Sequence, residues 1–132
     1  MSTHCNIHFN HGQKTYANIY LRTDGYPDAV LPNFQIFFRE VATQCDKTLY
    51  PSFFDDAPYL AAKFVIWQSD YNVKVISKFQ AIGKLAIYGI AVVNEDSPMS
   101  EYIYTVDCMT QDVNGFPIVN CVPEPEIDED DK

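Results

Sequence analysis

The chain has 132 residues, of which 47% are apolar and 14% aromatic, and this is enough to build one packed domain. No run approaches the roughly 18 consecutive apolar residues that cross a bilayer, and no basic segment followed by an apolar one stands at the N-terminus. We therefore expect one globular domain over residues 1–122, in the cytoplasm and without a membrane partner.

The net charge of −9 is unevenly distributed along the chain. Residues 124–132 hold six acidic residues against one lysine, which gives −5 and leaves −4 for the rest. This charge run predicts a disordered acidic tail over residues 123–132, which either keeps the chain soluble or imitates polyphosphate in a partner's basic groove. The nine Lys and Arg residues are scattered singly, which argues against direct binding of nucleic acid.

Two alternating segments open the chain. Residues 4–10 place Cys5, Ile7 and Phe9 on one face, and residues 15–22 alternate in the same way after a polar turn. This period of two predicts a β-hairpin with one apolar and one polar face.

A turn and two helices are predicted next. Asp24 and Gly25 form a turn pair, because Gly accepts a positive φ and Asp can hydrogen-bond its own backbone. Pro27 prevents the strand from continuing, so a helix must start just beyond it. Pro32 suits the first helical turn, and apolar residues from Leu31 onward recur at helical spacing to about Gln44. A second helix start at residues 55–58 precedes an apolar helix over residues 59–68.

The remaining segments are read as strands, except residues 69–83, which fit either a strand or a helix. Residues 84–93 form a continuous apolar run that predicts a central strand covered on both faces. Residues 101–108 alternate, and residues 116–122 predict an edge strand because Pro117 cannot donate to a ladder. The order β-β-α-α-β-β-β predicts an α+β fold, an antiparallel sheet of about five strands with two helices on one face.

Catalytic and metal-binding patterns are weak. His4 and His8 share a strand face about 13 Å apart, which is too far for one metal ion, and Cys5 points the other way. His11 lies in the turn that follows, and the four cysteines form no closely spaced pair, so we expect reduced thiols and no metal or cofactor. A metal-dependent hydrolase would require Asp24, Asp28 and Asp107 to converge.

The polar face of the hairpin is the strongest candidate for a binding surface. Tyrosine and asparagine bury area while keeping hydrogen-bonding tips, although aromatic residues also favour ordinary solvated strands. With His4, Asn6 and His8 on the same face, we expect Tyr88 and a later Tyr-Ile-Tyr strand to extend it. The candidate binding residues are Tyr16, Asn18, Tyr20, Arg22, Asp24, Tyr26, Tyr102, Tyr104, Glu124, Glu126 and Asp128.

Residues 20–28, Tyr-Leu-Arg-Thr-Asp-Gly-Tyr-Pro-Asp, and residues 58–67, Pro-Tyr-Leu-Ala-Ala-Lys-Phe-Val-Ile-Trp, resemble small proteins of phages, prophages and other mobile elements. Those proteins share a Tyr-x-His-x-Asp-Gly-Tyr-Pro turn, a Tyr-Leu-Ala-Ala-Lys-Phe-Val helix and a late Tyr-x-Tyr strand, here residues 102–104. Arg22 departs from the pattern where His is expected. The resemblance implies an accessory protein with no assigned activity and carries no catalytic residues.

Three hypotheses about function follow. The first is a non-enzymatic phage or mobile-element protein that occupies a basic groove of a host defence complex, such as a CRISPR complex, with acidic side chains in place of DNA. The second is a sponge for a nucleotide messenger, with tyrosines stacked on bases and Arg22, Lys14 or Lys84 on phosphate. The third is the metal-dependent hydrolase. A homodimer is a further expectation for the tyrosine-rich face.

Overall fold

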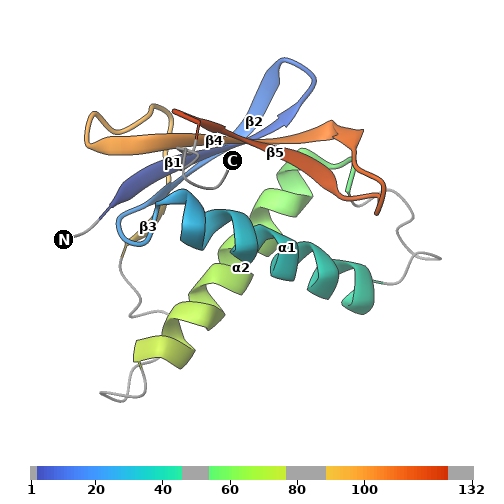
Figure 1. The fold of residues 1–132 in the computed structure, drawn as a ribbon, viewed down its shortest axis with the longest axis horizontal. Coiled ribbons are helices and arrows are strands. Elements are labelled where there is room, and N and C mark those ends of the chain that lie inside the picture. The colour runs from blue at the N-terminus through green and yellow to red at the C-terminus, as the bar shows by residue number, and fades with distance from the viewer. Residues whose placement is uncertain (1–2, 46–53, 77–88, 125–132) are drawn as a thin grey trace, which may run out of the picture.

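Within the part of the chain that the structure describes, two helices cover one face of a five-stranded sheet, and no helix lies on the other, helix-free face (Figure 1). This computed structural model describes residues 3–45, 54–76 and 89–124. The order β-β-α-α-β-β-β and the α+β class are as predicted. The elements are β1 (His4–His11), β2 (Lys14–Leu21), α1 (Pro27–Gln44), α2 (Ala57–Ile76), β3 (Ile90–Val92), β4 (Ser100–Gln111) and β5 (Pro117–Val122).

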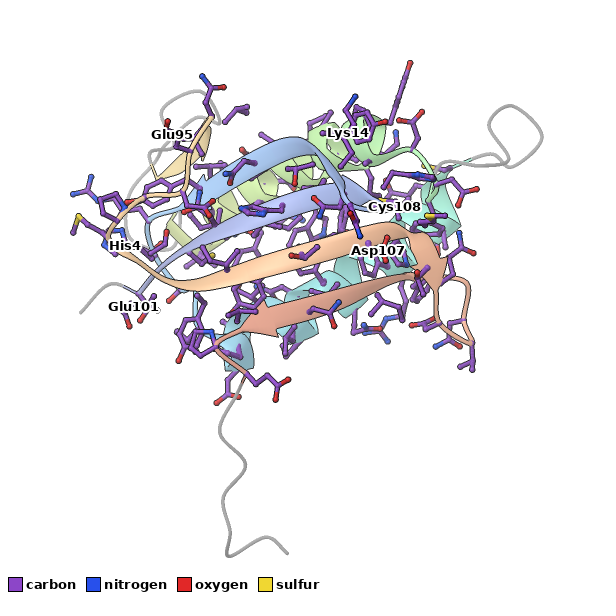
Figure 2. The ribbon with its side chains drawn as sticks, turned by 90° about the horizontal axis from the view of Figure 1, so that it is seen from above. His4, Lys14, Glu95, Glu101, Asp107 and Cys108 are labelled. Carbon is purple, nitrogen blue, oxygen red and sulfur yellow. The ribbon has the colours of Figure 1, made fainter. Side chains whose placement is uncertain are left out.

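The sheet is mixed, and this corrects the expected antiparallel sheet. The strand order is β3-β2-β1-β4-β5, and β1 pairs with β4 in parallel while the other three pairs are antiparallel. Alternation along a strand decides which face each side chain takes, but it does not decide the direction of the neighbouring strand. Because β3 and β4 lie on opposite sides of the hairpin, the connection 93–99 passes over β2 and β1 on the helix-free face (Figure 2).

The core lies between the sheet and the helices and is rich in phenylalanine. The apolar face of the hairpin points inward as predicted, with Cys5, Ile7, Phe9, Ile19 and Leu21 buried. Between the helices, the rings of Phe34 and Phe64 stack with their centroids 4.9 Å apart. Such ring pairs add stabilisation beyond the burial of their area.

Helix α1 begins at Pro27 itself, whereas the sequence predicts a start just beyond this residue. Tyr26 is the extended residue before it, with φ −77° and ψ 153°, which is the conformation that a following proline imposes. Pro27 occupies the first helical position, where the missing N–H would have had no helical partner. Pro32 therefore lies inside the helix and does not start it.

Helix α2 starts as predicted and extends further. The backbone N–H of Tyr59 donates to Asp56 Oδ1 at 3.3 Å, so Asp56 caps the helix. The helix continues to Ile76, so residues 69–76, which the sequence pattern left undecided between strand and helix, are helical. The rest of that segment, 77–83, lies outside the described residues.

The apolar run 84–93 was predicted to form a central strand, and this prediction was wrong for its described part. Residues 90–92 form β3 at one edge of the sheet, where Ala91 and Val92 are exposed. Residues 84–88, Tyr88 among them, lie outside the described residues. The central positions belong to β1 and β4, while β5 at the other edge begins with Pro117, as predicted.

The turn between β2 and α1 is held by contacts of Gly25. Its N–H donates to the carbonyl oxygen of Thr3 at 2.9 Å, and its own carbonyl accepts from the hydroxyl of buried Tyr104 at 2.7 Å. The positive φ belongs to Asp24, at 58°, and Gly25 is required for a different reason than predicted. A Cβ at Gly25 would lie 2.8 Å from Cys5 Cβ and 2.9 Å from its backbone nitrogen.

All four cysteines are free, and Cys5, Cys108 and Cys121 are buried while Cys45 is partly exposed. Burial raises the pKa of Cys5 and of Cys108 to about 12. At neutral pH these thiols are protonated and poor nucleophiles.

We expect Gly25→Ala to lower the free energy of unfolding by about 1 to 3 kcal/mol, because the added methyl group meets backbone atoms that cannot move aside. Urea unfolding monitored by circular dichroism measures the change. Asp24→Gly is the control, since it leaves this contact intact and is expected to alter stability by no more than about 1 kcal/mol. A Gly25→Ala variant as stable as the wild type would show that the close approach is not a constraint.

Candidate functional site

The predicted binding residues of the hairpin lie on the helix-free face of the sheet. Tyr16 is 47% exposed, whereas Asn18 and Tyr20 are partly buried. The hydroxyl of Tyr20 is hydrogen-bonded to His4 Nδ1, and Asn18 Oδ1 accepts from Asn6 Nδ2 at 2.9 Å. The hairpin therefore presents the predicted residue types, but most of them bond to one another.

Asn6 is the centre of this polar network and is fully buried. Its side-chain oxygen accepts a hydrogen bond from the backbone N–H of Ser97 at 3.0 Å and another from the hydroxyl of Ser100. Ser97 belongs to the connection between β3 and β4, and Ser100 is the first residue of β4. A buried amide with all these partners fixes the crossing segment in place.

Asp96 forms the second anchor of the connection. One of its oxygens, Oδ1, accepts from Asn18 Nδ2 at 2.8 Å and lies 2.6 Å from His8 Nε2. Partial burial acts to raise the pKa of Asp96, but the hydrogen bonds from His8 and Asn18 outweigh it and hold the pKa below its ordinary value of 3.8. The carboxylate is thus held in its ionised form.

Much of the predicted binding face therefore serves the fold. Asn6, His8 and Asn18 direct their polar atoms to residues 96–100, where they hold a connection that has no helix of its own. Asn10 is an exception, since its buried Oδ1 has no hydrogen-bond partner among the described residues.

A shallow cleft of about 510 Å³ remains open beside the connection. Its walls include Tyr16 and Asn18 on β2 and Asn94, Glu95 and Asp96 on the connection. Figure 2 shows Glu95 on the connection and Lys14 at the far end of β2. Lys14 Nζ lies 4.7 Å from the centroid of the Tyr16 ring, which is a cation–π contact.

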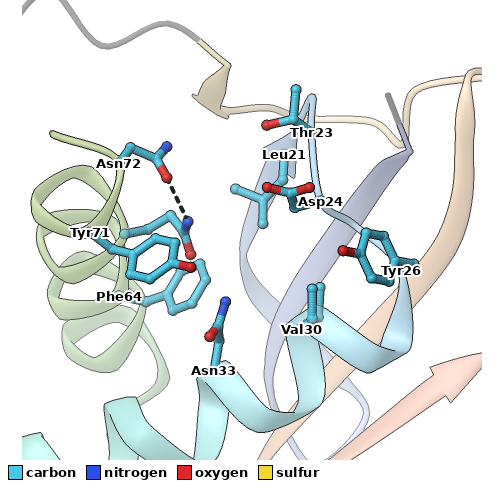
Figure 3. A pocket seen from close by; sticks show the side chains of 11 residues that line it. Leu21, Thr23, Asp24, Tyr26, Val30, Asn33, Phe64, Tyr71 and Asn72 are labelled. Atoms are coloured by element: carbon cyan, nitrogen blue, oxygen red, sulfur yellow. Dashed lines mark hydrogen bonds between the residues drawn. The ribbon is translucent and has the colours of Figure 1, made fainter. Parts of the chain in front are cut away.

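Asp24 and Tyr26 lie at a different place, in a small pocket between the β2–α1 turn and the two helices (Figure 3). Asn33 of α1 and Gln68, Tyr71 and Asn72 of α2 complete its polar wall, and the sequence pattern did not single out any of these four. Gln68, Tyr71 and Asn72 have helical spacing i, i+3, i+4, so extending the helix beyond residue 68 would have placed them on one face.

Other predicted residues fall elsewhere. Tyr104 is buried on the helix side of the sheet, and Tyr102 on the same side is half-buried, so neither extends the polar face as expected. The reason is the pairing of β4 with β1, where Tyr102 and Tyr104 lie opposite Cys5 and Ile7 and share their inward direction.

Arg22 is exposed at the end of β2, and its backbone N–H donates to the carbonyl of Gly89 at 2.8 Å. Glu124 is exposed, while Glu126 and Asp128 lie outside the described residues.

Asp24, Asp28 and Asp107 do not form a joint site. Asp24 lines the pocket beside the helices, and Asp107 lies on β4, where it accepts from the backbone N–H of Met109 at 3.0 Å. Across the described residues, no three His, Cys, Asp or Glu side chains gather closely enough to bind a metal ion. The convergence that the hydrolase hypothesis requires is therefore not found for these three carboxylates.

Comparison with known proteins gives no relative: no family model, no curated protein and no solved structure matches the chain. In the described part of the chain, neither helix has the length and apolar character needed to cross a membrane.

We expect Asp96→Asn to destabilise the protein at neutral pH by about 1 kcal/mol or less, since the pair with His8 is partly exposed. A lowered pKa means that the folded state binds fewer protons than the unfolded state in the titration range. The contribution of Asp96 is therefore present above its ordinary pKa and is lost as the pH falls through the lowered value.

Thermal unfolding of both proteins from pH 7 down to pH values below 3.8 measures this difference, which shrinks on acidification. Glu95→Gln is the matched control, because it removes a neighbouring charge that makes no hydrogen bond among the described residues. A difference between wild type and Asp96→Asn that does not change with pH would contradict the assignment.

Proposed function

We propose that this chain is a binding protein without enzymatic chemistry of its own, and that it docks the helix-free side of its sheet on a basic surface of another protein. The observation that supports this most directly is the cleft that combines the exposed ring of Tyr16 with Glu95 and Asp96. An aromatic face flanked by carboxylates suits the side chain of an arginine or lysine. Lys14 already occupies a position over this ring.

The overall charge supports the same kind of partner. The chain carries 18 acidic residues against nine Lys and Arg, and six of the acids belong to residues 124–132. A negative field of this kind speeds association with a positive groove and opposes association with nucleic acid or with a second copy of the same face. The partner that we propose, by analogy with small acidic proteins of mobile elements, is a host defence complex with a basic groove for nucleic acid.

A nucleotide messenger fits this cleft less well. A phosphate there would lie near the carboxylates of Glu95 and Asp96. The charges of the cleft thus favour a basic protein over a nucleotide.

We expect Glu95→Lys combined with Tyr16→Ser to weaken capture of the partner about tenfold or more, because the variant loses both an attractive charge and a buried aromatic contact. Tagged wild type and variant are exposed to lysate of the host cell, and bound proteins are quantified by mass spectrometry. Capture is repeated between about 0.1 and 1 M salt, where the Debye length falls from roughly 10 to 3 Å.

Asp28→Lys is the control, because it changes the net charge as Glu95→Lys does but lies at the start of α1 on the other side of the molecule. A partner lost equally from both variants would indicate a general charge effect and not the cleft. Capture that does not depend on salt would contradict the proposed electrostatic docking.

A second test concerns the acidic C-terminus. Removing residues 124–132 takes −5 from the net charge, so we expect the association rate to fall at low salt while the dissociation rate changes little. Surface plasmon resonance with the captured partner separates the two rates. An unchanged association rate would show that these residues have no steering role.

A further inference from the structure

The pocket beside the β2–α1 turn has the properties of a binding site for a small molecule. It encloses about 100 Å³, where roughly 10 to 15 Å³ of the same measure is enough for one water molecule. Phe64 and Tyr71 of α2 and Val30 of α1 form its apolar wall. It can therefore receive a group of a few heavy atoms but not a nucleotide.

The polar groups of this pocket differ from those of the helix-free face in their hydrogen bonding. On that face the side chains of Asn6, Asn18 and Asp96 are all bonded within the protein. In the pocket, the carboxylate of Asp24, the amide of Asn33 and the hydroxyls of Tyr26 and Tyr71 make no hydrogen bond to any described residue. Figure 3 shows these four side chains around the same space.

Gln68 adds a buried group to this set. Its side chain lines the pocket, and the residue is only 9% exposed. Its Nε2 donates to Asn72 Oδ1 at 3.1 Å, which orients the amide (Figure 3). No described residue donates to its carbonyl oxygen. This oxygen can accept a hydrogen bond from a ligand that occupies the pocket.

The charge of the pocket defines the ligand. Among the described residues that line it, Asp24 is the single charged one, and none of them is Lys, Arg or His. Asp24 is also held at a φ of 58°, a left-handed conformation that Gly25 keeps in place through its contacts with Thr3 and Tyr104. Such a conformation at a pocket wall is typical of residues positioned for binding.

We propose that this pocket binds a small organic cation with several N–H donors, a guanidinium or a primary ammonium group. The carboxylate of Asp24 pairs with the charge, and Gln68 Oε1 and the oxygens of Asn33, Tyr26 and Tyr71 accept its hydrogen bonds. The ring of Tyr71 gives the cation an aromatic wall. The cation is either a free small amine or the end of an arginine or lysine side chain of a protein.

The test is a titration of the full chain, labelled with ¹⁵N, with agmatine followed by NMR. We expect saturable shifts of the backbone amides of residues 21–26 and 68–72. Asp24→Asn weakens binding roughly ten- to a hundredfold, which corresponds to the loss of one charge-assisted hydrogen bond. Asparagine also tolerates the left-handed conformation, so the turn is preserved in this variant.

Asp28→Asn is the matched control. Asp28 lies four residues after Asp24, carries the same charge, and does not line the pocket. It is expected to bind agmatine as the wild type does. Tyr71→Phe, which keeps the aromatic wall, is expected to weaken binding less than Asp24→Asn. A short peptide with one internal arginine is titrated in parallel, and whichever of agmatine and the peptide binds more tightly identifies the source of the cation.

The proposal is overturned if neither probe gives saturable shifts, if Asp24→Asn binds as tightly as the wild type, or if the neutral analogue urea shifts the same amides to the same extent. The agmatine titration tests the pocket independently of the proposed docking surface, since Tyr16 and Glu95 do not line the pocket. Loss of the partner through Glu95→Lys with Tyr16→Ser, without any change in agmatine binding, would separate the two sites.

Discussion

The close contact of Gly25 with the first strand is the constraint on which much of the structure depends. The backbone of Gly25 lies against Cys5, donates a hydrogen bond to the carbonyl of Thr3 and accepts one from the hydroxyl of the buried Tyr104. The turn after β2 is therefore tied to β1 and β4 at once. This contact fixes where α1 begins, because Tyr26 and Pro27 follow directly. It also holds Asp24 in its left-handed conformation at the wall of the pocket.

The parallel pairing of β1 with β4 has the second largest effect. It requires the connection 93–99 to cross the sheet without a helix, and the polar face of the hairpin supplies the hydrogen bonds that hold it. Residues that alone suggest a binding surface, such as Asn6 and His8, are thereby used within the molecule. The two binding sites that we propose lie elsewhere, at the cleft beside Tyr16 and at the pocket beside Asp24, where the carboxylates of Glu95 and Asp24 make no hydrogen bond to a described residue.

The two proposed sites suit different ligands. The cleft is shallow, exposed and flanked by carboxylates, which suits the surface of a basic protein where long-range charge contributes to the rate of association. The pocket is small and is lined by the carboxylate of Asp24 and the amide of the mostly buried Gln68, which suits a single cationic group held by short-range hydrogen bonds. They lie on opposite sides of the sheet, so a ligand at one leaves the other accessible.

Local patterns in the sequence were sufficient to predict the order of the elements, the inward face of the hairpin, the Asp56 cap and the position of β5 at an edge. Each of these depends on side-chain periodicity, or on proline and capping chemistry, within a few residues. Contacts between distant segments decided the rest. The register of β4 beside β1 turned Tyr104 inward, the close approach to Cys5 explained Gly25, and the packing of α2 beside the turn brought Gln68 and Tyr71 to Asp24. The periodicity of a single segment does not show which strands and helices become its neighbours in space, and these contacts depend on those neighbours.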